Sequence, residues 1–275
     1  MKRNWISATI FLFVAIYGLV GCQTTPPVSV EAPSTTQITE QTQMTEESLT
    51  EETEVTEAPT EVTEPEGIQE DKILPMYLSY YRQNQDMVGW IRMPGTQIYY
   101  PVMQTGLDNA NYYLDKDFDH QTTIAGAIYV REFCDVFRPS DNVVIYGHNM
   151  RDESMFGSLG RFREQSHWQN NQYVYFDNLY ESHVYQIFAV FAISADPGNF
   201  PYHEYNDFAS QEEFEEFIRI VTNHPDADPA ITGQFIFYYD TGIRPEYGDK
   251  LITLSTCTKR AGANGRMVLI AYRVS

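Results

Sequence analysis

The 275-residue chain has little positive charge. It holds 18 lysines and arginines against 38 aspartates and glutamates, which gives a formal net charge of −20 at pH 7. The imbalance is concentrated between Glu31 and Asp71, where 13 residues are acidic and none is lysine or arginine. Without a basic patch, a nucleic-acid partner is not expected. Because like-charged blocks repel and stay extended, this acidity describes one segment and says little about the fold.

Cysteine is also scarce, and occurs only as Cys22, Cys134 and Cys257. No group of cysteines and histidines has the spacing of a metal site, so we predict neither a metal nor an organic cofactor. A disulfide between Cys134 and Cys257 is the simplest role for two cysteines in an exported protein. That alternative stays open on the sequence alone.

One long hydrophobic run follows Lys2 and Arg3 and extends from Trp5 to Cys22. This arrangement is typical of an export signal, and the run is short for a membrane span of ~20 residues. Its end, LVGC at residues 19–22, resembles the lipobox of bacterial lipoproteins, in which the signal is cut before a cysteine that carries lipid. We predict lipidation of Cys22. An uncleaved signal anchor and an ordinary signal with a chance cysteine are the alternatives.

Residues 23–70 are rich in threonine, glutamate and proline and poor in aromatic residues. Their apolar content is too low to offset the entropy cost of ordering the chain. We therefore predict three parts: an export signal at residues 1–22, a disordered acidic stalk at 23–70 and a globular domain at 71–275.

The predicted globular domain contains many short β-prone runs, such as NVVIYG at 142–147 and KLITLSTC at 250–257. Pro94-Gly95 between two such runs predicts a hairpin. Three segments have apolar residues at helical spacing: residues 73–84, 154–164 and 207–221. Because strands and helices do not alternate regularly, the pattern predicts a mixed α/β, strand-dominated fold and favours a β-barrel over a doubly wound sheet.

The motif TLSTC ends one apolar run with Cys257. A free thiol titrates near 8.5, so a nucleophilic cysteine needs a base or positive neighbours. Of the six histidines, His148 follows the apolar run VVIYG and would emerge at a strand end, whereas the other five lie among polar residues. A small buried thiol and a structural histidine are the alternatives.

Three signatures together resemble those of the sortases, the cysteine transpeptidases of Gram-positive surfaces: YGHNM at 146–150, TLSTC at 253–257 and Arg266. Three further stretches are similar to class B sortases: VGWIRMPGTQIYYPVMQ (88–104), NYYLDKDFD (111–119) and MFGSLGRF (155–162). The resemblance covers about Asp71 to the C-terminus. It implies a closed β-barrel with an N-terminal helix and a helix inserted between two barrel strands.

The resemblance implies that Cys257 is the nucleophile, His148 the general acid and base, and Arg266 the stabiliser of the oxyanion. Three residues match the lining of the family's substrate groove: Leu114, Tyr146 and Ser255. Some class B members carry an acidic residue directly or closely behind the cysteine. Residues 258–260 are Thr-Lys-Arg in this chain, which puts a role for such an acid in doubt.

The implied reaction cleaves a C-terminal sorting motif of exported proteins, typically after a threonine, through a thioester on Cys257. The acyl group then passes to an amine of a cell-wall precursor or a pilin. The predicted location is the extracytoplasmic face of the membrane, with the N-terminus as tether. A hydrolytic cysteine protease and a non-catalytic surface lipoprotein that binds a ligand are the alternatives.

Overall fold

The computed structural model describes residues 67–275. The predicted export signal, the lipid-carrying Cys22 and nearly all of the predicted stalk lie outside these residues. Within the described part, no helix is both long enough and apolar enough to cross a membrane.

Strands dominate the domain, as the sequence predicts. Residues 67–275 form nine strands: β1 (Met87–Arg92), β2 (Tyr99–Met103), β3 (Ile128–Val130), β4 (Asn142–Tyr146), β5 (Tyr173–Asn178), β6 (Val184–Ser194), β7 (Phe235–Phe237), β8 (Leu251–Cys257) and β9 (Gly265–Arg273). Strands β1 and β2 pair antiparallel around Pro94 and Gly95, so the predicted hairpin is confirmed.

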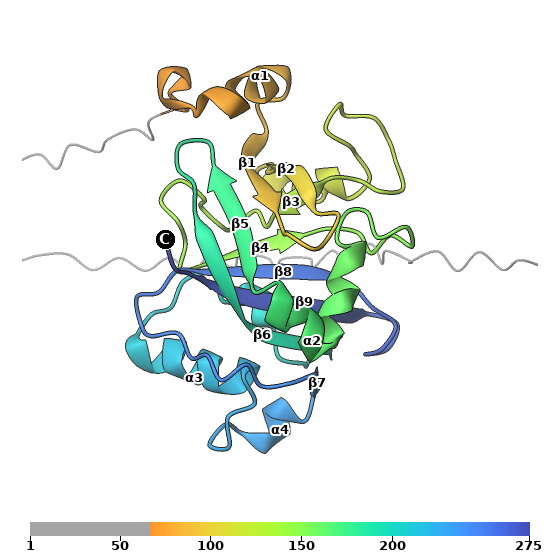
Figure 1. The fold of residues 1–275 in the computed structure, drawn as a ribbon, viewed down its shortest axis with the longest axis vertical. Coiled ribbons are helices and arrows are strands. Elements are labelled where there is room, and N and C mark those ends of the chain that lie inside the picture. Colours follow the sequence, from red (N-terminus) through yellow and green to blue (C-terminus); the bar gives the residue numbers. More distant parts are fainter. Residues whose placement is uncertain (1–66) are drawn as a thin grey trace, which may run out of the picture. The chain divides into compact units, whose positions relative to one another are not determined.

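Eight of these strands close into a barrel (Figure 1). They follow the order β5-β1-β2-β3-β4-β8-β9-β6, and pairing of β5 with β6 closes the ring. Strand β7 adds to β6 beside this ring. The pairs β2–β3 and β4–β8 are parallel, and the other pairs are antiparallel. The predicted strand-dominated closed barrel is therefore confirmed.

Helices lie between the strands and at the start of the domain. The described residues contain four α-helices, α1 (Pro75–Gln83), α2 (Gln165–Asn170), α3 (Gln211–Val221) and α4 (Pro229–Thr232). Five short 3-10 helices complete the set: η1 (Glu70–Lys72), η2 (Leu107–Asn109), η3 (Tyr112–Leu114), η4 (Gly157–Arg163) and η5 (Tyr202–Glu204). Helix α1 precedes the barrel, and α3 lies in the chain between the barrel strands β6 and β8, which confirms the N-terminal helix and the inserted helix.

Two predicted helices differ in detail from the structure. The helix expected over 207–221 begins at Gln211, because Ser210 has an extended backbone and its side chain caps the helix by accepting from the Glu213 N–H. The segment 154–164 is mostly the 3-10 helix η4. A Cβ on Gly157 would lie 2.2 Å from the Met150 carbonyl oxygen, so close packing against the preceding loop shapes this segment.

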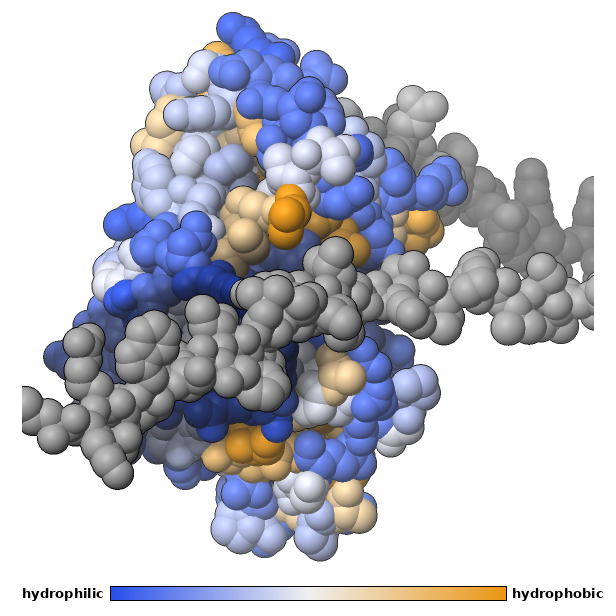
Figure 2. All heavy atoms as spheres, turned by 90° about the vertical axis from the view of Figure 1, so that its right-hand side faces the viewer, coloured by the Kyte–Doolittle hydropathy of each residue, from blue (hydrophilic) through white to orange (hydrophobic). Residues whose placement is uncertain are grey.

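Buried apolar residues form three clusters around the barrel. The largest fills its interior and includes Ile91, Val144 and Leu254. A second joins α3 to β6 and β9 through Phe214 and Phe217, and a third lies under α1. Figure 1 shows α1 and α3 at opposite ends of the domain. The face in Figure 2 is mostly hydrophilic with small hydrophobic patches, as expected when the apolar side chains form a core.

Candidate active site

The parallel pairing of β4 and β8 brings the two predicted motifs together. Tyr146 pairs with Ser255 at the end of this ladder, and His148 and Cys257 each follow two residues later. The segments that carry His148 and Cys257 therefore run side by side and in the same direction beyond this pair. Close packing explains why residue 147 is a glycine: a Cβ there would lie 2.5 Å from Ile128 Cδ1.

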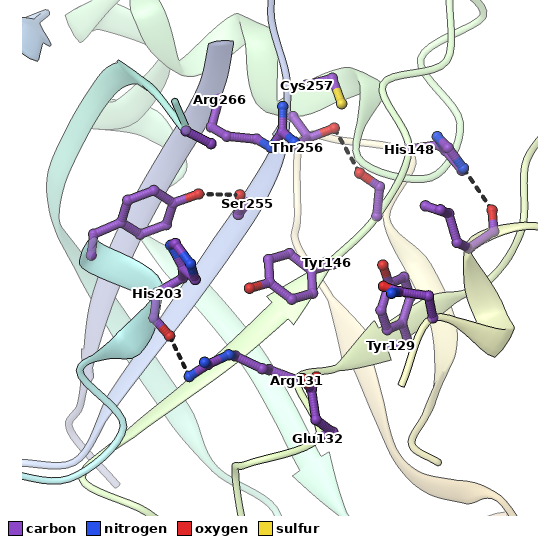
Figure 3. Close-up of a pocket in the computed structure, with 15 residues that line it drawn as sticks. Tyr129, Arg131, Glu132, Tyr146, His148, His203, Ser255, Thr256, Cys257 and Arg266 are labelled. Carbon is purple, nitrogen blue, oxygen red and sulfur yellow. Dashed lines mark hydrogen bonds between the residues drawn. The ribbon is translucent and has the colours of Figure 1, made fainter. Parts of the chain in front are cut away.

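Pairing of β8 with β9 adds the third predicted residue. Cys257 and Arg266 are direct partners in this antiparallel pair. Directly opposite residues project from the same face of a sheet, which puts the thiol and the guanidinium on one side. Figure 3 shows Cys257, His148 and Arg266 around the same end of a pocket. The structure thus brings the three predicted catalytic residues together.

The two cysteines of the described domain have different surroundings, and both are free thiols. Cys257 is exposed, whereas Cys134 is buried and its Sγ lies 3.6 Å from the Asn142 carbonyl oxygen. Burial raises the pKa of Cys134 to about 11, so this thiol stays protonated at neutral pH. The disulfide alternative finds no support in this arrangement.

His148 is oriented by a backbone carbonyl. Its Nε2 lies 2.7 Å from the carbonyl oxygen of Leu114. Since a carbonyl oxygen only accepts, Nε2 must carry the hydrogen, and Nδ1 is left to take or give a proton. In Figure 3, the dashed line from the His148 ring marks this hydrogen bond.

The Arg266 guanidinium is held on one side by the backbone of the preceding turn. Its Nη1 donates to the carbonyl oxygens of Asn264 and Gly265, each at 3.1 Å. The fork of a guanidinium carries five donors, so further N–H groups remain for a substrate oxygen. A permanently charged donor opposite the thiol suits the stabilisation of an oxyanion.

A pocket of about 390 Å³ connects these groups to the predicted substrate groove. The three residues predicted to line that groove, Leu114, Tyr146 and Ser255, all line this pocket. The Ser255 hydroxyl lies on the buried floor, at 2.8 Å from the hydroxyl of Tyr202. Burial raises the pKa of Tyr202 to about 12, so the phenol is neutral and can donate a hydrogen bond.

Several pocket residues were not predicted from the sequence. These are Asn111, Tyr129, Arg131, Glu132, Ala195, Tyr202, His203 and Thr256. Tyr129 lies on the three-residue strand β3, and its place opposite Tyr146 depends on the register of β3 and β4. Asn149, within the quoted motif YGHNM, was also missed as a contact: its Nδ2 donates to the Cys257 carbonyl oxygen at 2.7 Å.

One end of the pocket is polar. The Arg131 guanidinium donates to the His203 carbonyl oxygen at 2.7 Å and to Asn206 Oδ1 at 2.9 Å. Burial lowers the pKa of the His203 imidazole, and the nearby charge of Arg131 lowers it further. The neutral form of the His203 imidazole is therefore favoured.

Comparisons with known proteins agree with this arrangement. The family model of the sortase domain matches residues 91–274. Sortase B of Listeria monocytogenes is 31% identical over 192 residues, covering 68% of this chain and 69% of the relative. Sortase B of Staphylococcus aureus is 24% identical over 205 residues, covering 74% of this chain and 77% of the relative.

Solved structures show the same fold. Sortase B of Bacillus anthracis in complex with AAEK1 has a TM-score of 0.60 at 29% identity, covering 74% of this chain and 86% of the other. A second B. anthracis structure, described as similar to sortase B, has a TM-score of 0.61 at 30% identity, covering 76% and 87%. The chain belongs to the sortase family of cysteine transpeptidases, and within it to class B.

Proposed function

We propose that this sortase cleaves a C-terminal sorting motif of exported proteins and transfers the acyl group to an amine of the cell wall or of a pilin. The observation that carries the proposal is the convergence of Cys257, His148 and Arg266 on one pocket. A thiol, an imidazole and a guanidinium in that arrangement are suited to acyl transfer through a thioester.

In the proposed mechanism, the Cys257 thiolate attacks the carbonyl carbon of the scissile bond, typically that of a threonine. Arg266 stabilises the resulting oxyanion. His148 protonates the departing amine, and the carbon–nitrogen bond breaks to leave a thioester on Cys257. An acceptor amine then attacks the thioester, His148 takes its proton, and the thiolate is released as the new amide forms.

The donor peptide is proposed to lie in the pocket beside Leu114, Tyr146 and Ser255. The exposed Leu114 offers an apolar contact at the wall, while Tyr146 and Ser255 form part of the floor. Burial raises the pKa of Tyr146 far above its ordinary value, so its phenol stays neutral. A neutral, partly aromatic floor is compatible with a short uncharged peptide segment.

Incubation with a library of internally quenched threonine-containing peptides, with and without triglycine, tests the reaction. Triglycine is the ligand in one solved sortase B complex that is 24% identical to this chain. An amide product supports transpeptidation, and free acid despite the amine indicates a hydrolytic protease. No turnover would favour a binding module. The Cys257→Ala variant is the control and should form neither product nor acyl-enzyme.

The tether is a separate proposal, since residues 1–22 lie outside the described part. We propose that lipid on Cys22 holds the enzyme at the extracytoplasmic face of the membrane, and that residues 23–70 act as a flexible stalk. As a coil, a stalk of this length would have an end-to-end distance of roughly 35–40 Å. Mass spectrometry of the membrane-extracted protein decides: an acylated N-terminus at Cys22 supports the proposal, and an intact one with Lys2 and Arg3 refutes it.

A further inference from the structure

A carboxylate in the loop after β6 contacts the turn that precedes Arg266. Asp196 lies two residues beyond Ser194, the last residue of β6. Its Oδ2 accepts from the Ser194 hydroxyl at 2.6 Å, and its Oδ1 accepts from the Asn264 side-chain Nδ2 at 2.5 Å. Both oxygens are therefore engaged, and the carboxylate joins two segments that are 68 residues apart.

Asn264 connects this carboxylate to the arginine. While its side chain binds Asp196, its carbonyl oxygen accepts from the Ala195 N–H at 3.0 Å and from Arg266 Nη1 at 3.1 Å. The loop after β6 thus holds Asn264 twice, once by the side chain and once by the backbone. Any shift of Asn264 moves an acceptor of the guanidinium.

The strands alone do not fix the position of that guanidinium. Arg266 pairs with Cys257 in β8 and with Ile193 in β6, so the sheet holds its backbone. A free arginine side chain has many rotamers, so a fixed backbone does not fix its guanidinium. The contacts beyond its Cβ therefore decide where its donors lie relative to the thiol.

The charge of Asp196 fits this position. Hydrogen bonds from Ser194 and Asn264 hold the pKa of Asp196 below its ordinary value, and the charge of Arg266 lowers it further. Within residues 67–275 no direct ion pair joins Asp196 to Arg266. The carboxylate consequently reaches the arginine through Asn264.

We propose that Asp196 is a positioning residue for the Arg266 guanidinium and that it acts through Asn264. The inference rests on the proposed function, because the position of Arg266 affects the rate only if it stabilises the oxyanion. In this chain the residues behind the cysteine, 258–260, are Thr-Lys-Arg and include no acid. The acidic side chain to which we assign a role comes from the loop after β6. The role is distinct from that of the loop residues Tyr202 and His203, which line the pocket itself.

The test is a double-mutant cycle measured by the rate of acyl-enzyme formation. Intact-mass spectrometry follows the acyl-enzyme with the best donor peptide of the library described above, so slow variants stay measurable. Asp196→Ala should lower this rate about tenfold, since misplacing a catalytic group by about 1 Å can cost 10²-fold. KM should change less than twofold. Asn264→Ala should give the same loss, and the double variant should be no slower than either single one.

The decisive comparison uses Arg266→Lys as the background, where Asp196→Ala should have no further effect. If Asp196→Ala lowers the rate of acyl-enzyme formation as much in this background as in the unmodified enzyme, the proposal is overturned. A raised KM with an unchanged acylation rate would also overturn it, and would assign Asp196 to substrate binding. Asp228→Asn is the matched control: it removes a charge at the start of α4, away from the pocket, and asparagine still caps the helix. Absence of acyl-enzyme in the unmodified protein would instead refute the proposed function.

Discussion

Exchange of Arg266 for lysine separates the shape of the proposed oxyanion donor from its charge. In the structure, Nη1 already serves two carbonyl oxygens of the preceding turn, at 3.1 Å each. A guanidinium can keep these bonds and still offer other N–H groups to a substrate oxygen. A lysine ammonium has its three donors on a single atom, so the turn carbonyls and the oxyanion would compete for the same group.

The size of the effect follows from the donor that is lost. Removal of one oxyanion donor costs about 10²–10³-fold in kcat, which corresponds to about 2.7–4 kcal/mol. We therefore expect Arg266→Lys to slow acyl-enzyme formation by about 10²-fold or more. Because the oxyanion exists only after attack, KM should change much less than the acylation rate.

The assay is a single-turnover reaction with a quenched donor peptide, stopped in acid and analysed by intact mass. Arg273→Lys is the matched control, since it makes the same exchange on the same strand and Arg273 does not line the pocket. This control should acylate at the unmodified rate. An Arg266→Lys variant within threefold of the unmodified enzyme, or an equal loss in the Arg273→Lys control, would refute the assignment of Arg266.

Three further predictions concern the thiols, the core and the N-terminal segment. Iodoacetamide at pH 8 should label Cys257 in the folded protein and spare the buried Cys134, whose pKa is about 11. Peptide mapping that finds Cys134 labelled before Cys257 would contradict this. Phe217→Ala should lower the free energy of unfolding by about 3–5 kcal/mol in urea titrations while cleavage persists, because the ring is buried between α3 and the barrel; a loss below about 1 kcal/mol would contradict that packing. A chain starting at Asp71 should cleave donor peptides in solution at the full-length rate, and a tenfold loss would assign a catalytic role to the preceding residues.

Local features of the fold could be predicted because their causes are local. The hairpin follows from a turn pair between two apolar runs, and α3 follows from apolar residues at helical spacing. A closed barrel was expected, but which strands close it, β5 and β6, could not be predicted, nor could the pairing of the three-residue strand β7 with the far half of β6. A strand as short as β7 carries no periodic signal, and its assignment depends on the partner strand.

The candidate site shows the same division. The sequence predicts that Cys257 and His148 lie at strand ends, and the structure has them there. Arg266 is the second residue of β9. The hydrogen bond from His148 to the Leu114 carbonyl, and the contact of Asp196 with Asn264, join residues far apart in the sequence. Such contacts depend on how the loops pack on the folded barrel, so no local sequence pattern predicts them.

The parallel pairing of β4 with β8 has a consequence for folding kinetics. It joins strands that are more than a hundred residues apart, and the proposed nucleophile and base lie directly beyond it. We expect such a contact to form late, because the chain between the two strands must be closed as a loop before the pairing stabilises anything. No early intermediate that lacks this pairing can hold the two reacting groups together. Recovery of activity after dilution from urea should therefore follow the slowest structural phase, and never precede it.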